Sequence, residues 1–138
     1  MENSNQKTPK VLNVLLWIAQ SLLAAMFLMA GFTKVATPID QLAVAMPWVA
    51  QVPAAEIKFI GVSEILGALG LLLPSALRIK PRLTVLAAIG LGLVMILALA
   101  FHMSRGEFSA IPTNIVLVSF ATFIAWGRSK NAAIHARA

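Results

Sequence analysis

The sequence predicts an all-α integral membrane protein, a four-helix bundle with an interfacial or re-entrant segment between its first two helices. Hydrophobic residues make up 59% of the 138 residues and charged residues only 12%, which is about half the charged share of an ordinary soluble domain. The apolar residues fall in four long runs. The basic residues are concentrated in alternate links between these runs.

A polar lead, residues 1–10, precedes the first apolar run at residues 11–32. This run is long enough to cross about 30 Å of hydrocarbon. The longest connection follows at residues 33–55, and it combines three prolines with many apolar side chains. Because it is too apolar for a free loop, we expect it to be interfacial or re-entrant, with Trp48 at the level of the lipid headgroups.

Three further spans are predicted at residues 56–73, 83–101 and 111–126. The second span is expected to end at Pro74, because proline interrupts a helix. Pro112 is compatible with the first turn of the fourth span, which is short for a bilayer. The four spans form one membrane domain, residues 11–128, and a basic tail, residues 129–138, follows it.

Charge distribution predicts the orientation of the spans. Eight of the 11 Lys and Arg residues lie in the lead, the second link and the end of the chain, at Lys7, Lys10, Arg78, Lys80, Arg82, Arg128, Lys130 and Arg137. Positive residues collect on the cytoplasmic side of a membrane. We therefore expect both termini in the cytoplasm.

With this topology, polar side chains from all four spans reach the outer third of the bundle. Glu64 lies inside the second span, where a carboxylate is costly unless it faces other helices. Lys34, His102 and Asn114 come to the same level from the other spans. We expect Glu64 to contact Lys34 or His102. These four residues and Trp48 are the candidate ligand-binding residues, around a pocket that the segment 33–55 covers.

Each candidate also has a structural interpretation. Lys34 can anchor a helix end at the interface, and His102 can be an interfacial histidine. Asn114 can cap the fourth helix or join a hydrogen bond between helices. Glu64 can form an ion pair that only fixes the helix register.

Small residues predict close contacts between the helices. They recur in the second span at Gly61, Gly67 and Gly70, and in the third span at Ala88 and Gly92.

Several kinds of site are excluded. The chain has no cysteine, so it offers no thiolate ligand for iron–sulfur clusters or zinc. Its two histidines, His102 and His135, belong to opposite ends of the bundle, so no haem and no metal site is expected. The basic residues lie between apolar runs rather than on one face beside aromatics, so the net charge of +6 does not indicate nucleic-acid binding.

Two motifs resemble those of the DoxX-like family of small four-span bacterial membrane proteins. Ala30-Gly31-Phe32-Thr33-Lys34 resembles the Gly-x-x-Lys signature of the family, and Gly61-x-x-Glu64-x-x-Gly67-x-x-Gly70 resembles its second-span motif. The basic second link and His102 extend the resemblance over residues 11–128. The family is named for a small subunit of a quinone-linked thiosulfate oxidoreductase. The resemblance therefore implies a bacterial inner-membrane protein near quinone-linked or oxidant-handling chemistry, without a catalytic residue to carry over.

Three functions remain open at this stage. The first is a membrane module or subunit of a quinone-linked or oxidant-handling system, which binds a lipophilic ligand or a partner in the bilayer. That partner is a second copy of the chain or an oxidoreductase subunit. The second is an oxidoreductase component in which His102 and Glu64 bind or deprotonate a quinol. The third is a small transporter of lipophilic solutes. Quinone is the candidate cofactor.

Overall fold

The computed structural model describes residues 9–138, so most of the predicted polar lead lies outside the described residues. Within this range the chain is all-α, as predicted, and contains no strand. Its elements are α1 (Lys10–Ala36), α2 (Ile39–Ala45), η1 (Pro47–Gln51), α3 (Ala54–Leu77), α4 (Arg82–Ser104), η2 (Phe108–Ala110), α5 (Ile111–Trp126) and η3 (Gly127–Asn131).

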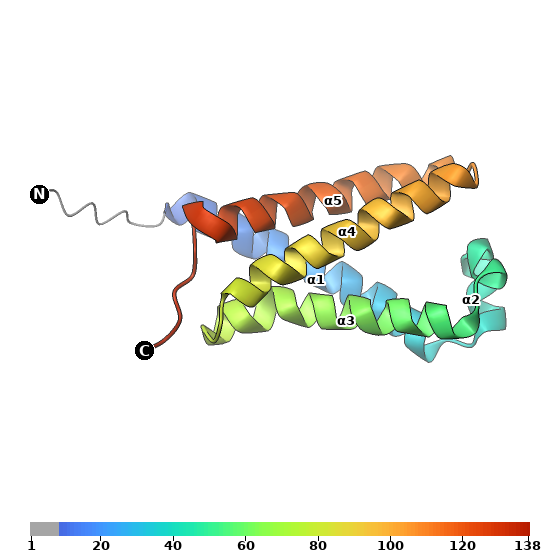
Figure 1. Ribbon diagram of the computed structural model, residues 1–138, viewed down its shortest axis with the longest axis horizontal. Helices are drawn as coiled ribbons and strands as arrows, with labels where there is room; N and C mark the ends of the chain where they lie inside the picture. The colour runs from blue at the N-terminus through green and yellow to red at the C-terminus, as the bar shows by residue number, and fades with distance from the viewer. Residues whose placement is uncertain (1–8) are drawn as a thin grey trace, which may run out of the picture.

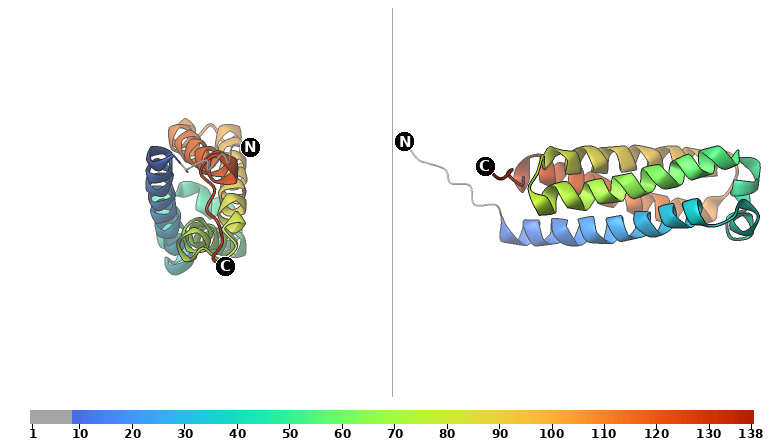
Figure 2. Two further views of the ribbon diagram at one scale, coloured as in Figure 1. Left: turned by 90° about the vertical axis from the view of Figure 1, so that its left-hand side faces the viewer. Right: turned by 90° about the horizontal axis from the view of Figure 1, so that it is seen from below.

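The long helices form an elongated bundle of two pairs (Figure 1). Helix α1 packs along α3, α4 packs along α5, and α3 also contacts α4. The start of α1 and the C-terminus lie at one end, which we call the terminal end (Figure 2). Residues 37–53, which we call the cap, lie across the opposite end together with the α4–α5 link. The two pairs separate towards this cap end (Figure 1).

Within residues 9–138, four helices are long and apolar enough to cross a membrane, and they cover 27, 24, 23 and 24 residues. The last one runs from Phe108 to Asn131, because η2 and η3 continue α5 at its two ends. The prediction that the fourth span is short was therefore wrong. Large apolar side chains such as Val11, Phe59 and Leu93 are exposed, as expected for a surface that meets lipid.

Two predicted boundaries also differ. Pro74 lies inside α3 rather than at its end. Its missing N–H removes only one helical hydrogen bond, and α3 continues until Arg78 adopts the left-handed conformation, with φ of 57°. Helix α1 continues to Ala36, so the first connection is shorter than predicted. Pro112 lies in the first turn of α5, as expected.

Glycines bring α1 and α3 into direct backbone contact at the cap end. A Cβ added to Gly61 would lie 2.8 Å from the carbonyl oxygen of Gly31 and 2.9 Å from the Cβ of Lys34. Gly67 and Gly70 face Leu91 and Ala87 of α4 at similarly close range. These close distances are consistent with the packing role expected for the three glycines. Ala88 is buried in the core, whereas Gly92 makes only an ordinary van der Waals contact.

A group of buried polar residues lies at the terminal end. The sequence placed Arg128 beside the polar tail, but only 4% of its surface is exposed. Its Nε donates to Gln20 Oε1 at 2.6 Å, and its Nη1 donates to Asn13 Oδ1 at 2.7 Å. Gln20 in turn donates to the carbonyl oxygen of Leu71. Arg128, in η3, is therefore bonded directly to α1 and is linked to α3 through Gln20.

Candidate functional site

A cavity of about 890 Å³ lies between the two helix pairs at the cap end. The core is closed around Leu23, Phe27 and Leu91. The cavity lies on the cap side of this level, at the end where the ribbons of the two helix pairs diverge (Figure 1). Its lining is mostly apolar and comes from all four long helices and the cap: Met26, Phe27, Met29, Ala30, Thr33, Lys34, Met46, Trp48, Val52, Glu56, Ile60, Glu64, Val94, Met95, Leu97, Ala98, Phe101, His102, Thr113, Asn114 and Leu117. All five candidate residues predicted from the sequence therefore line one cavity.

The carboxylate of Glu64 is held by the ammonium group of Lys34. The Lys34 Nζ lies 2.8 Å from Oε2 and 3.0 Å from Oε1, and both residues are buried. The close contact between Gly31 and Gly61 brings the two helices near enough for this pair. The expectation that Glu64 faces the bundle and contacts Lys34 is confirmed. Lys34 is thus a buried ion-pair partner rather than an anchor at the interface.

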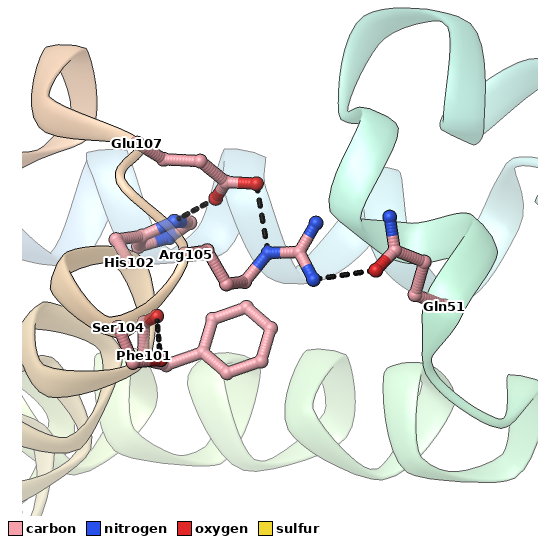
Figure 3. A network of polar contacts seen from close by, with 6 residues as sticks. All are labelled: Gln51, Phe101, His102, Ser104, Arg105 and Glu107. Carbon is pink, nitrogen blue, oxygen red and sulfur yellow. Dashed lines mark hydrogen bonds and ion pairs between the residues drawn. The ribbon is translucent and has the colours of Figure 1, made fainter.

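His102 has a different partner from the one expected. Its Nδ1 lies 2.6 Å from Oε2 of Glu107, five residues further along the chain. Arg105 donates from Nε to the other oxygen of Glu107 at 2.8 Å and from Nη1 to Gln51 Oε1 at 2.6 Å (Figure 3). The hydrogen bond from His102, followed by that from Arg105, lowers the pKa of Glu107 below its ordinary value of 4.5. This network connects the cap to the end of α4.

Trp48 and Asn114 complete the polar and aromatic part of the lining. The ring of Trp48 meets Phe101 and His102 edge-on, with centroid distances of 5.9 and 6.1 Å. Trp48 also packs on an apolar cluster that joins Leu42 and Val49 of the cap to Ile57 of α3. The Nδ2 of Asn114 is buried and has no hydrogen-bond partner in residues 9–138. An unpaired amide beside a cavity is available to a ligand.

Two features of the site were not predicted from the sequence. Met26, Met29, Met46 and Met95 line the cavity together, although their spacing shows no period. Glu107 and Arg105 lie between the third and fourth predicted spans, and the sequence did not indicate that Glu107 binds His102 or that Arg105 binds Glu107. The short separation between His102 and Glu107 was the available signal, because a helix end can turn such neighbours towards each other.

These features define a small multi-pass membrane protein with a largely apolar cavity between its helices. The chain belongs to the DoxX-like family, whose model (DoxX_2) matches residues 18–124. No curated protein and no solved structure matches the chain significantly. The matched range covers all of the lining residues and both motifs around Lys34 and Glu64.

Proposed function

We propose that this protein is a membrane module that binds a small lipophilic ligand of the quinone class in the cavity at the cap end. It serves as a component of a quinone-linked or oxidant-handling system. The observation that carries this proposal is the cavity itself, which combines an apolar wall with a few convergent polar groups. Ligand sites generally have this composition, with volumes of about 300–1,000 Å³.

The arrangement suits a ligand with a flat polar head and an apolar tail. His102, Asn114 and the Lys34–Glu64 pair offer hydrogen-bonding groups to the oxygens of the head. Methionine side chains are flexible and polarisable, so Met26, Met29 and Met95 can adapt to an aromatic or isoprenoid surface. Met29 and Leu97 line the cavity and 70% of the surface of each is exposed, so the cavity is not enclosed at these residues and leaves room for a tail to extend from it.

One observation favours the alternative, a component that acts directly on quinol. His102 has an oriented ring beside the cavity, with Glu107 as its partner. The structure changes the roles first considered for this alternative, since Lys34 already engages both oxygens of Glu64. In this alternative, the group that takes a proton from a ligand hydroxyl is therefore His102 rather than Glu64.

The proposed location is the bacterial inner membrane, with both termini in the cytoplasm. The distribution of Lys and Arg supports this orientation, and the cap then faces the opposite side. Reporter fusions at the C-terminus and in the link at Arg105 test it. A C-terminal reporter that is active only outside the cytoplasm would contradict the orientation.

The ligand is tested by extracting the protein from its native membrane into polymer-bounded nanodiscs and quantifying quinone in an organic extract. Ala98→Phe fills the cavity, whereas Ala100→Phe adds the same ring to an exposed position outside the lining. We expect quinone at nearly one molecule per wild-type or Ala100→Phe chain, and at the membrane background with Ala98→Phe. Equal quinone content in all three samples would contradict the proposal.

A further inference from the structure

His102 is the most strongly oriented of the polar groups that line the cavity. Its Nδ1 is bound to Glu107, and Arg105 holds the other oxygen of that carboxylate. Arg105 is held in turn by Gln51 of the cap and lies over the ring of Phe101, 5.3 Å from its centroid (Figure 3). The imidazole is therefore held by Glu107 at Nδ1 and by edge-on contacts with the rings of Trp48 and Phe101.

The hydrogen-bond partner of His102 Nδ1 determines whether the other ring nitrogen, Nε2, is a donor or an acceptor. A carboxylate only accepts hydrogen bonds, so Nδ1 carries the proton in the neutral imidazole and Nε2 carries a lone pair. Nε2 makes no hydrogen bond within residues 9–138 and is not sealed from the surroundings. His102 lines the cavity, so the chain presents an unused acceptor at this site.

The other charged groups of the lining are less suitable as acceptors. Glu64 is bound through both oxygens to Lys34. Glu56 also lines the cavity, but it is exposed at the start of α3 and has no hydrogen-bond partner within residues 9–138 that fixes its carboxylate. Asn114 offers an amide that can turn either its donor or its acceptor towards a ligand. Only His102 combines an open lone pair with a fixed orientation.

We propose that His102 Nε2 accepts a hydrogen bond from a hydroxyl group of the lipophilic ligand, and that Glu107 is the positioning residue that holds the proton of the neutral imidazole on Nδ1 and so leaves the lone pair on Nε2. The ligand class is then a phenol or hydroquinone with an apolar tail. This inference rests on the proposed function and deepens it, because it selects the reduced, hydroxyl-bearing form of the ligand.

The positioning role is tested by nitrogen-15 NMR of the imidazole in detergent micelles. His135 is the second of two histidines, so His135→Gln, purified through a tag without histidine, leaves only the signals of His102. We expect the Nδ1–H tautomer of His102 in this background and in the control variant Asp40→Asn. We expect the same tautomer in Glu107→Gln, because the amide oxygen of glutamine still accepts the hydrogen bond from Nδ1. Glu107→Leu should lose this preference. An unchanged tautomer in Glu107→Leu, or an Nε2–H tautomer in the background protein, would overturn the positioning role.

Recognition of the hydroxyl is tested with 4-nonylphenol and its methyl ether, which share an apolar body and differ in the O–H donor. We expect the phenol to bind about tenfold more tightly and to shift the Nε2 signal, which the ether should leave in place. His102→Phe should reduce phenol binding to the level of the ether without weakening the ether. Equal binding of both probes to the wild type would overturn the inference that His102 recognises the hydroxyl group. The proposal that the cavity binds a lipophilic ligand would still stand. Binding of neither probe would count against the proposed function itself.

Discussion

The ammonium of Lys34 lies 2.8 and 3.0 Å from the two carboxylate oxygens of Glu64. Both residues are buried, since only 6% of the surface of Lys34 and 4% of that of Glu64 are exposed. The pair joins α1 to α3 inside the bundle, directly beside the cavity. A buried ion pair is costly to break from one side, because the remaining charge loses its partner. The two residues should therefore depend strongly on each other.

We predict that Lys34→Met or Glu64→Leu alone lowers the free energy of unfolding by about 3–5 kcal/mol. The double variant should lose less than either single variant, because it leaves no unpaired charge. Unfolding in mixed micelles with increasing SDS measures these differences, with the exposed Lys130→Gln as the control. Additive losses in the double variant would show that the two charges are not coupled.

The contact between Gly31 and Gly61 gives a second prediction. A methyl group at Gly61 would meet the Gly31 carbonyl oxygen at 2.8 Å, so Gly61→Ala must push α1 and α3 apart. We expect a loss of about 1–3 kcal/mol, as for other overpacked positions. Gly90→Ala is the matched control, because nothing lies within 4 Å of its added Cβ.

The Gly90 control should be neutral or slightly stabilising, since alanine favours a helix by up to about 1 kcal/mol over glycine. Thermal denaturation of both variants in one detergent makes the comparison. Similar losses at the two positions would mean that the close packing of α1 on α3 does not limit stability.

Arg128 and Gln20 give a third prediction. Removal of the guanidinium in Arg128→Leu leaves the buried Gln20 Oε1 without its donor, at a cost of about 1–3 kcal/mol. Arg128→Lys should recover only part of this loss, because the single ammonium group of lysine does not reproduce the planar guanidinium that binds Gln20 and Asn13 at the same time. Arg137→Gln, at an exposed position, is the control. Full recovery by lysine would indicate that only the charge matters.

The pH dependence of stability follows from Glu107. Its pKa is lowered in the folded protein by hydrogen bonds from His102 and Arg105. Its contribution to stability is therefore complete above the ordinary value of 4.5 and is lost as pH falls from there through the folded value. We predict that the difference in melting temperature between wild type and Glu107→Gln is constant near neutral pH and shrinks below about pH 4.5. A difference that grows on acidification would contradict this assignment.

The sequence was sufficient for the fold and for part of the site. Long apolar runs leave the backbone few options besides helices, and the cost of a carboxylate inside a span required a partner for Glu64. The partner of His102 was not predictable in the same way, because the turn after α4 determines whether Glu107 or Glu64 comes within reach. Tertiary packing also decides that Arg128 turns inwards to Gln20 and that Pro74 is tolerated within α3.

The central claim is that a quinone-class ligand occupies the cavity between the two helix pairs. The most direct measurement is photo-crosslinking of a photoreactive alkyl quinone to the protein in nanodiscs, with the labelled residues identified by mass spectrometry. We predict that labels concentrate on cavity residues such as Met29, Trp48 and Met95, and that Ala98→Phe removes them. Labels distributed over outward-facing residues such as Phe59 and Leu93, and unaffected by Ala98→Phe, would contradict the claim.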